Sequence, residues 1–169
     1  MTVLDGYSSS NLHVGLRPVT AEDEEFLLQL YACTREAEMA LVPWTLEQQR
    51  EFINSQFVAQ RTHYQSAYPR AEHHIIMRDE RRLGRLYVDR QPSEIRIIDI
   101  TILPEYRNSG IGGGLIGNLA DEARRDRRTL TIYVESFNPS IQLFERIGFK
   151  PKETNGVHIL MELLPPVAS

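Results

Sequence analysis

The chain has very little cysteine and no long apolar run. Cys33 is the single cysteine among 169 residues, which excludes an intrachain disulfide and a cysteine-based zinc site. No apolar stretch approaches the roughly 20 residues that cross a bilayer, and the start has neither the basic nor the apolar part of a secretory signal. We therefore expect a soluble, cytoplasmic protein with no membrane partner.

A basic surface is missing as well. The net charge is −4, and the sequence contains no stripe of basic residues interleaved with aromatic ones. Because phosphate neutralisation supplies most non-specific affinity for nucleic acids, we expect no nucleic-acid partner. His73 and His74 are adjacent, so on a strand they point to opposite faces and cannot chelate one metal as a pair. We expect no metal.

What is present indicates one globular domain. With 41% apolar and 25% charged residues, the composition lies near the globular average, and the length suffices for one core. We expect a single domain over residues 1–169, with a flexible tail at 1–11.

Apolar periodicity predicts helices first and a sheet afterwards. The acidic run from Glu22 to Glu25 indicates a helix start, and Thr45 with Gln48 forms a capping box for a second helix that ends before Pro69. Further helices are predicted over 111–123 and 139–147. Strands are predicted over 12–19, 74–77, 83–88, 95–103, 130–134 and 158–164. The strand at 95–103 has β-branched residues on both faces, which is typical of a central strand.

The segment after this central strand is the best candidate for a ligand site. Residues 107–112 read Arg-Asn-Ser-Gly-Ile-Gly and lead into a helix. Glycines let the backbone approach a ligand closely, and the first amides of a helix have no internal acceptor. Together with the partial positive charge of a helix start, this predicts an anion site suited to a pyrophosphate.

The same glycines also fit a dinucleotide-binding fingerprint. Gly112, Gly114 and Gly117 have the spacing, and Glu135 follows at a suitable distance. In that motif, however, the glycines form the tight turn directly after the strand, whereas here six residues from Pro104 to Ser109 intervene. The dinucleotide-binding domain is therefore a remote alternative.

Two segments resemble the GNAT superfamily of acetyltransferases. Residues 102–112, Ile-Leu-Pro-Glu-Tyr-Arg-Asn-Ser-Gly-Ile-Gly, fit the family's apolar-x-Pro strand end followed by Arg/Gln-x-x-Gly-x-Gly/Ala. Residues 138–149, Asn-Pro-Ser-Ile-Gln-Leu-Phe-Glu-Arg-Ile-Gly-Phe, are similar to its Asn-Pro-Ala-x-x-Leu-Tyr-x-x-x-Gly-Phe block. The resemblance implies an α/β (α+β) fold with a mixed, mostly antiparallel sheet, splayed between its fourth and fifth strands, with helices on both faces.

The resemblance also implies the cosubstrate and its binding residues. Acetyl-CoA would place its pyrophosphate on backbone amides of 107–112 and its pantetheine arm along Ile102 and Leu103, with Asn138 on the opposite wall. Asn138 also suits a helix N-cap, which needs no ligand. The implied cofactor-binding residues are Ile102, Leu103, Arg107, Asn108, Ser109, Gly110, Ile111, Gly112, Asn138 and Phe144.

Phe144 departs from the family pattern. The family usually has Tyr here, near the thioester sulfur, where the hydroxyl is thought to protonate the leaving thiolate. Phenylalanine cannot donate a proton, and general acid catalysis typically increases the reaction rate by about 10² to 10⁴. This leaves two interpretations, an N-acetyltransferase and a weak or inactive acyl-CoA-binding module.

For catalysis, the resemblance implies direct attack of an amine on the thioester through a tetrahedral intermediate. The backbone amide of Ile102 or Leu103 is the candidate oxyanion donor. Asp99 and Glu135 are the candidate bases, acting directly or through water, because an alkylammonium must lose a proton first. Asp99 also fits a buried acid paired with an arginine, and Glu135 a solvated strand end.

The acceptor is the least specified part. Residues 1–60 hold nine acids and three bases, which favours a cationic small-molecule or peptide amine. Trp44 and Tyr68 flank the second helix, which in the family helps form the acceptor pocket, and Tyr133 lies beside the expected slot. Trp44 fits core packing equally well. The arginines at 124–128 fit a solvated helix end or a site near the coenzyme's ribose phosphate, and a homodimer is left open.

Overall fold

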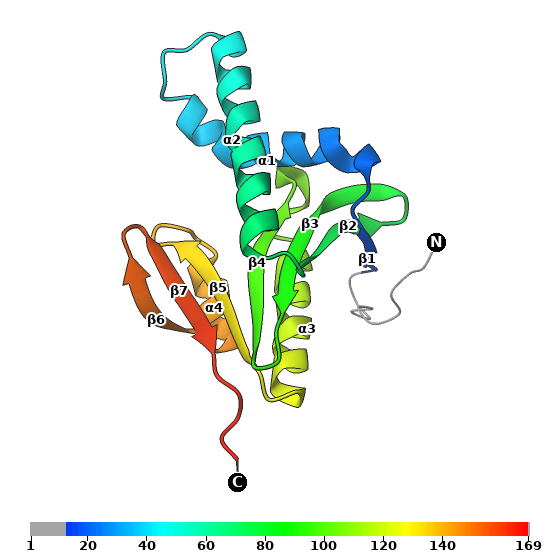
Figure 1. Ribbon diagram of the computed structural model, residues 1–169, viewed down its shortest axis with the longest axis vertical. Coiled ribbons are helices and arrows are strands. Elements are labelled where there is room, and N and C mark those ends of the chain that lie inside the picture. The colour runs from blue at the N-terminus through cyan, green and yellow to red at the C-terminus, as the bar shows by residue number, and fades with distance from the viewer. Residues whose placement is uncertain (1–12, 169) are drawn as a thin grey trace.

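The computed structural model describes residues 13–168, so the tail predicted at 1–11 lies outside the described residues. Within that range, seven strands form one sheet in the order β1-β2-β3-β4-β5-β7-β6 (Figure 1). In chain order the elements are β1 (Gly15–Pro18), η1 (Ala21–Asp23), α1 (Glu24–Met39), α2 (Leu46–Ala67), β2 (Glu72–Arg78), β3 (Arg81–Arg90), β4 (Glu94–Ile102), η2 (Pro104–Tyr106), α3 (Ile111–Arg125), β5 (Thr129–Glu135), α4 (Ile141–Ile147), β6 (Lys150–Asn155) and β7 (His158–Leu163).

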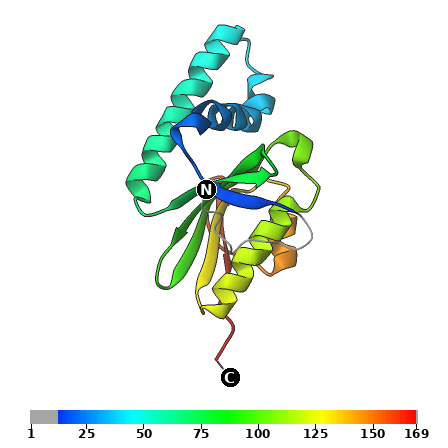
Figure 2. The ribbon, with the colours of Figure 1, turned by 90° about the vertical axis from the view of Figure 1, so that its right-hand side faces the viewer.

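Helices cover both faces of the sheet, as predicted. α3 and α4 pack on one face, where Leu115 and Phe144 join the core of the central strands. α1 and α2 pack on the other face, where Leu30 and Phe57 meet Ile75 of β2. The α1–α2 loop and the first half of α2 extend beyond the sheet (Figures 1 and 2).

The sheet is split at its centre, which confirms the predicted splay. β4 and β5 are parallel and pair only from Glu94–Thr129 to Ile97–Ile132. Beyond this point β4 continues to Ile102 against β3, while β5 continues to Glu135 against β7. The upper halves of the two strands diverge in Figure 1. Every other strand pair is antiparallel.

A β-bulge lies where the two strands part. Val88 pairs with Ile97 and Tyr87 with Asp99, so Ile98 has no partner on β3. A bulge bends its strand and increases the local twist. It also reverses the alternation of faces, so Ile97 and Ile100 both join the core under α3. Asp99 therefore turns to the α1–α2 side, where it meets Arg85.

Local sequence explains how the first two helices begin. The capping box of α2 is present as predicted, because the Gln48 amide donates to Thr45 Oγ1 at 3.2 Å and the Thr45 amide donates to Gln48 Oε1 at 2.9 Å. Before α1, the fully buried Asp23 accepts hydrogen bonds from Arg17 and from the Thr20 amide, and pairs with Arg82 at 2.9 Å. The hydrogen bonds from Arg17 make the largest contribution to holding the pKa of Asp23 well below its usual range, with smaller contributions from the Thr20 amide and the charge of Arg82. This acid therefore stabilises the fold and is not available to an acceptor.

One strand was not predicted from the sequence. β6, Lys150–Asn155, is exposed at every residue and lies at the edge of the sheet. It carries two lysines and a proline, which are typical of edge strands that must not pair with other chains. Because neither of its faces is buried, the alternation that marks a strand is missing.

The longest helix, α2, has 22 residues, but its surface is polar. Within residues 13–168, no helix combines the length and apolar character needed to cross a membrane.

We expect the free energy of unfolding to fall as the pH is lowered from about 6.5 towards 4, because of His73. Its ring stacks on Tyr87 at 4.3 Å, and its Nε2 is buried with no hydrogen-bond partner among the described residues. Burial lowers the pKa of His73 from 6.5 to about 4. Between these values the unfolded chain binds the proton and the folded chain does not, so stability rises with pH in this window.

Urea unfolding at pH 7 and pH 4.5 measures this effect. At about 1.4 kcal/mol per pKa unit the upper bound is about 3 kcal/mol, and we expect about 1 to 2 kcal/mol because solvent reaches part of the ring. His73→Phe keeps the stacking and should reduce the pH dependence, with a remainder from His74, whose pKa burial also lowers. The same slope in wild type and variant would contradict this assignment.

Candidate active site

The gap between β4 and β5 opens into a cleft of about 660 Å³. Its walls come from both strands, from α1 and α2, from the start of α3 and from α4. The cleft thus brings together segments from the whole chain at the point where the sheet is split. Of the predicted site residues, it is lined by Asp99, Ile102, Arg107, Gly112, Tyr133, Glu135, Asn138 and Phe144.

The glycine-rich loop presents backbone amides at the start of α3. Asn108 and Gly110 have positive φ values of 57° and 86°, so the loop turns sharply before the helix. The first helical bond runs from the Gly114 amide to the Gly110 carbonyl at 2.9 Å, which leaves the amides at 111–113 without an internal acceptor. This is the geometry of an anion site at a helix start.

Two details of this loop refine the sequence prediction. The amide of Arg107 donates to the Pro104 carbonyl at 3.2 Å within η2, so this amide is already used. A Cβ at Gly112 would lie 3.4 Å from Ile102 Cδ1, so the glycine keeps space between the loop and β4.

Gly117 lies inside α3 rather than in a turn after a strand, which contradicts the dinucleotide fingerprint.

The backbone of β4 distinguishes the two candidate oxyanion donors. The Leu103 amide donates to the Leu83 carbonyl at 2.8 Å, so it belongs to the sheet. Hydrogen bonding alternates along an antiparallel pair, so the Ile102 amide, opposite Gly84, points away from β3 towards the gap. Leu103 was therefore wrong as a donor, because its amide is already bonded. The Ile102 carbonyl accepts a bond from Arg107 Nε at 2.9 Å.

Gly84 makes this close strand pairing possible. A Cβ at this position would lie 2.1 Å from the Thr101 carbonyl oxygen and 2.9 Å from Ile102 Cα, both backbone atoms. Any side chain on Gly84 would thus push the end of β4 away from β3. The glycine fixes the position of the amide that faces the cleft.

On the opposite wall, Ser140 rather than Asn138 is the N-cap of α4, and Asn138 forms a turn just before the helix. Its side-chain oxygen accepts a bond from the Ser140 amide at 2.9 Å, just before α4 begins at Ile141. This helix begins two residues later than the prediction of 139. The Nδ2 group of Asn138 is the part of the side chain that remains for a ligand in the cleft.

Phe144 forms an apolar part of the cleft. Its ring is 2% exposed and lies edge-on to Phe149, with centroids 5.4 Å apart. This contact places Phe144 in the core as well as at the cleft wall. Its position offers no proton donor, as the sequence indicated.

Three acids line the cleft, and two of them are paired. Asp99 accepts bonds from Arg85 Nε at 2.6 Å and from Thr101 Oγ1 at 2.9 Å. Glu38 pairs with Arg35 at 2.8 Å. Glu135 is exposed and has no ion pair or hydrogen bond from its side chain within residues 13–168. Asp99 is thus an acid paired with an arginine, and Glu135 is the open carboxylate.

The remaining polar groups at this end of the cleft surround Arg85. Arg85 Nη2 donates to Gln60 Oε1 at 2.7 Å, and its guanidinium lies 5.9 Å from the ring centre of Tyr64. Burial, with the charge of Asp99, raises the pKa of Tyr64, so its phenol is neutral at physiological pH. Burial also raises the pKa of the Cys33 thiol on α1, which disfavours a thiolate nucleophile.

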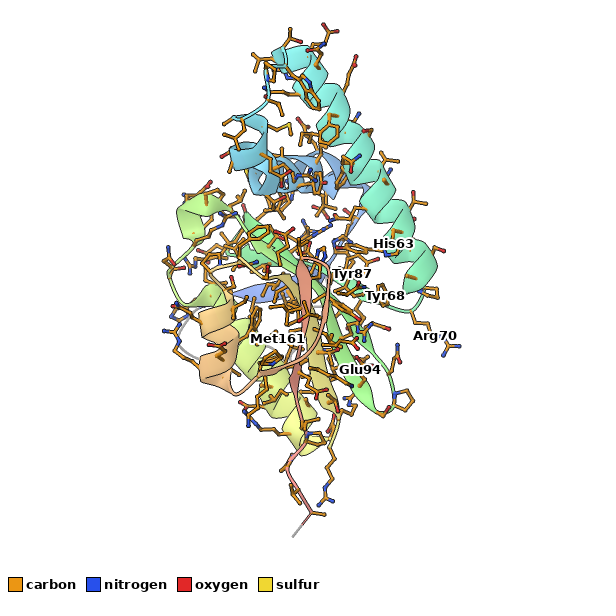
Figure 3. All side chains as sticks on the ribbon, turned by 90° about the vertical axis from the view of Figure 1, so that its left-hand side faces the viewer. His63, Tyr68, Arg70, Tyr87, Glu94 and Met161 are labelled. Atoms are coloured by element: carbon orange, nitrogen blue, oxygen red, sulfur yellow. The ribbon has the colours of Figure 1, made fainter. Side chains whose placement is uncertain are left out.

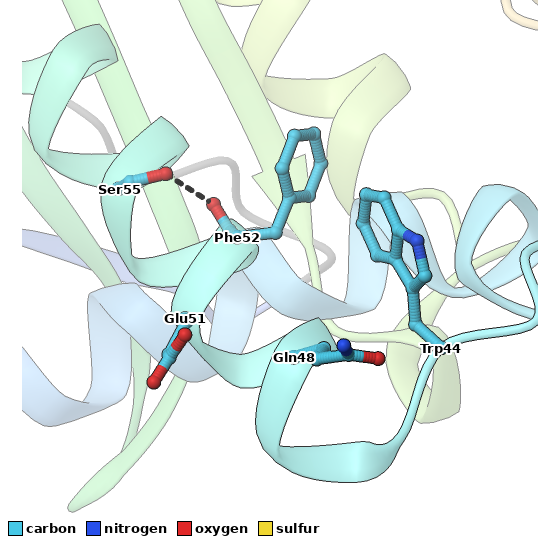
Figure 4. A pocket seen from close by; sticks show the side chains of 5 residues that line it. All are labelled: Trp44, Gln48, Glu51, Phe52 and Ser55. Atoms are coloured by element: carbon cyan, nitrogen blue, oxygen red, sulfur yellow. Dashed lines mark hydrogen bonds between the residues drawn. The ribbon is translucent and has the colours of Figure 1, made fainter.

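Two predicted acceptor residues lie outside the cleft. Trp44 packs edge-on against Phe52 at 5.2 Å in a separate hollow with Gln48, Glu51 and Ser55 (Figure 4). Tyr68 ends α2 at its C-terminus (Figure 3). Tyr133 does line the cleft, with the Arg96 guanidinium 5.3 Å from its ring centre.

Several cleft residues were not predicted from the sequence. They come mainly from the inner faces of α1 and α2 and from the ends of strands. The sequence allowed an arginine partner for Asp99 but gave no signal that this partner is Arg85. The missed residues include Tyr31, Thr34, Arg35, Gln60, Tyr64, Arg85, Leu143 and His158.

The arginines at 124–128 lie at the other end of α3 from Gly110. A helix of 15 residues spans about 22 Å, so these side chains start far from the amide loop. Arg128 pairs with Glu122 at 3.2 Å, and Arg124 donates to the Ile147 carbonyl at 3.1 Å. Residues 124–127 are exposed, which supports a solvated helix end, whereas Arg128 is half-buried in its ion pair. No cluster of three potential metal ligands occurs in the described part of the chain.

Comparisons with known proteins agree with this geometry. The model of the acetyltransferase (GNAT) family matches residues 27–149. The fold is similar to PaiA N-acetyltransferase from Thermoplasma acidophilum in complex with coenzyme A, with a TM-score of 0.66 and 17% identity over 89% of this chain and 98% of that chain. No curated protein sequence matches the chain.

Two further structures have the same fold. An acetyltransferase from Thermus thermophilus has a TM-score of 0.63 and 18% identity, over 90% of this chain and 97% of that chain. The ribosomal-protein-S18-alanine N-acetyltransferase from Escherichia coli has a TM-score of 0.57 and 19% identity, over 92% of this chain and 96% of that chain.

Proposed function

Since the chain belongs to the GNAT family of acetyltransferases, we propose that it moves an acetyl group from acetyl-CoA to an amine. The observation that carries the proposal is the position of the unbonded amides at 111–113, directly beside the gap between β4 and β5. An anion site at a helix start and an open strand backbone are both needed to hold a diphosphate with a long amide-bearing arm.

The residues present fit acetyl-CoA. Amides at 108–113 would hold the diphosphate, and the space kept by Gly112 would leave room for it beside Ile102. The arm would lie between β4 and β5, with Asn138 Nδ2 on the far wall. When bound, the coenzyme supplies an acetyl group activated as a thioester.

Residues of this chain would then assist the transfer. The Ile102 amide points into the gap, where it would stabilise negative charge on the acetyl oxygen. Of the two acids predicted as bases, Glu135 rather than Asp99 is open to the acceptor's side of the cleft, because Asp99 is held by Arg85. This open carboxylate at the cleft rim also favours a cationic amine as the acceptor.

A thiol-release assay with purified protein tests the proposal. Acetyl-CoA is supplied with spermidine, L-lysine, an aminoglycoside or a short peptide with a free N-terminus, and coenzyme binding is measured in parallel by calorimetry. Turnover with at least one amine is expected. The same assay is run with alcohols in place of the amines, and turnover with alcohols alone would falsify the proposal that the acceptor is an amine.

The second candidate is an acyl-CoA-binding module without catalysis, which the phenylalanine at 144 favours. It predicts heat of binding with acetyl-CoA and no thiol release with any amine of the panel. The free thiol's ordinary pKa of about 8.5 makes its anion a tolerable leaving group near neutral pH, so we favour the enzyme.

We expect Phe144→Tyr to raise turnover about tenfold or more while leaving affinity for acetyl-CoA unchanged. The added hydroxyl would provide the missing proton donor beside the leaving thiolate. Phe149→Tyr is the matched control, because Phe149 is equally buried and does not line the cleft. A large loss of coenzyme affinity in Phe144→Tyr alone would show that the ring does not lie near the thioester.

A further inference from the structure

His158 is the one histidine that lines the cleft within the described residues. It begins β7 and lies directly opposite Glu135 of β5 in the antiparallel register. Opposite residues in such a pair have Cβ atoms about 4.5 to 5.5 Å apart on the same face of the sheet. The imidazole and the carboxylate therefore share one rim of the cleft.

This rim is held by backbone hydrogen bonds. The two strands pair without interruption from Leu130–Leu163 to Glu135–His158. The next bond, from the Ser136 amide to the Val157 carbonyl at 2.7 Å, closes the end of the pair. The two side chains thus lie on regular strands, which position functional groups more precisely than loops do.

The charged group that faces His158 across the strand pair is a carboxylate. Glu135 faces it from β5, and Asn155, which is uncharged, is its partner on β6. Glu153 lies further along β6, opposite Leu160. The arginines of the cleft, Arg35 and Arg85, are already paired with Glu38 and Asp99. The titratable group directly opposite the imidazole is therefore a carboxylate.

We infer that His158 is the general base of the transfer and that Glu135 positions it. The inference rests on the proposed function. An ammonium acceptor gives a proton to the imidazole, and the neutral amine then attacks the acetyl carbon. The C–N bond forms, the C–S bond breaks with its electron pair going to sulfur, and the second N–H proton leaves to water. The imidazolium returns its proton to the thiolate, the role for which Phe144 has no group.

This assignment suits neutral pH better than a carboxylate alone. Proton transfer is most efficient when the base has a pKa near the working pH, and imidazoles as a class titrate near 6.5 whereas carboxylates titrate near 4. Within residues 13–168 the Glu135 side chain makes no hydrogen bond to the ring, but it stands opposite the ring across the strand pair, from where a carboxylate that turns to the imidazolium orients and stabilises it. Glu135 is thus a positioning residue rather than the base itself.

The test compares His158→Gln with wild type over the pH profile of kcat/KM. The assay uses acetyl-CoA and whichever of spermidine, L-lysine or the peptide wild type acetylates fastest. We expect a loss of about 100-fold, no acidic limb near the pH of imidazole titration, and affinity for acetyl-CoA within twofold of wild type. Glu135→Gln should retain more activity than His158→Gln, with the loss in kcat rather than in KM. His63→Gln is the matched control, because His63 lies on α2 outside the cleft (Figure 3).

A second variant excludes a merely structural effect. His158→Ala should regain activity when free imidazole is added, and His63→Ala should not respond. The inference is overturned if His158→Gln keeps the acidic limb and activity within threefold of wild type, or if imidazole gives no rescue. A wild-type protein that binds acetyl-CoA but acetylates no amine overturns the proposed function itself, and the inference with it.

Discussion

Gly112→Asp is expected to weaken binding of acetyl-CoA about 1,000-fold. The substitution places a carboxylate among the amides that we assign to the diphosphate. Two unit charges about 4 Å apart in a partly exposed site repel by about 4 kcal/mol, which is close to three orders of magnitude in Kd. Calorimetric titration with acetyl-CoA measures the loss. The fold should be kept, because an acid in the first turn of a helix is stabilising.

Gly117→Asp is the matched control. It introduces the same side chain in the same helix, at a position where a Cβ meets nothing within 4 Å. Its carboxylate lies beyond the first turn, where the influence of the helix end has faded. We expect its affinity to stay within about threefold of wild type. Equal affinities for the two variants would contradict the diphosphate site.

Ile102→Pro is expected to lower kcat about 100- to 1,000-fold. Proline removes the amide hydrogen that faces the gap, and loss of one oxyanion donor typically costs about 2.7 to 4 kcal/mol. The sheet should tolerate the change, because this amide does not bond to β3, unlike that of Leu103. Thiol release at saturating amine measures kcat, and thermal unfolding measures the fold.

Ile102→Val separates the backbone effect from the side chain. It keeps the amide and removes one methylene from the core, which typically costs about 0.5 to 1.5 kcal/mol of stability. Its kcat should stay within threefold of wild type. If Ile102→Pro folds and retains kcat within fivefold, the acetyl oxygen is not stabilised by this amide.

Much of the fold could be predicted because its elements have clear local signals. Thr45 and Gln48 fix the start of α2, and the apolar spacing of residues 111–123 fixes α3. The split between β4 and β5 came from the resemblance carried by two motifs, and the strand register confirms it. β6 could not be found, since a strand exposed on both faces has no apolar period.

The site was predicted where it depends on backbone and missed where it depends on packing. The loop at 107–112 has a sequence signature, so its amides were expected at the right place. Choosing between the Ile102 and Leu103 amides as oxyanion donor required the strand register against β3. If β4 were shifted by one residue, the amides that bond to β3 would face the gap instead, and those that face the gap would bond.

Contacts between distant elements were the other part that the sequence could not provide. The sequence left Asp99 open between a base and an acid paired with an arginine, and the structure identifies that arginine as Arg85, 14 residues away on β3, at 2.6 Å. His158 has no local sequence signal, because its partner Glu135 is adjacent only through the pairing of β5 and β7. Trp44 was expected at the acceptor site, but the length of α2 carries it to a hollow beyond the cleft.

A crystal structure of the protein with coenzyme A tests the central claim most directly. We expect diphosphate oxygens within about 3 Å of amide nitrogens in the range 108–113, and the thiol sulfur between β4 and β5 on the side towards which the Ile102 amide points. A coenzyme bound elsewhere on the chain, or crystals grown at saturating coenzyme A with this loop empty, would contradict it.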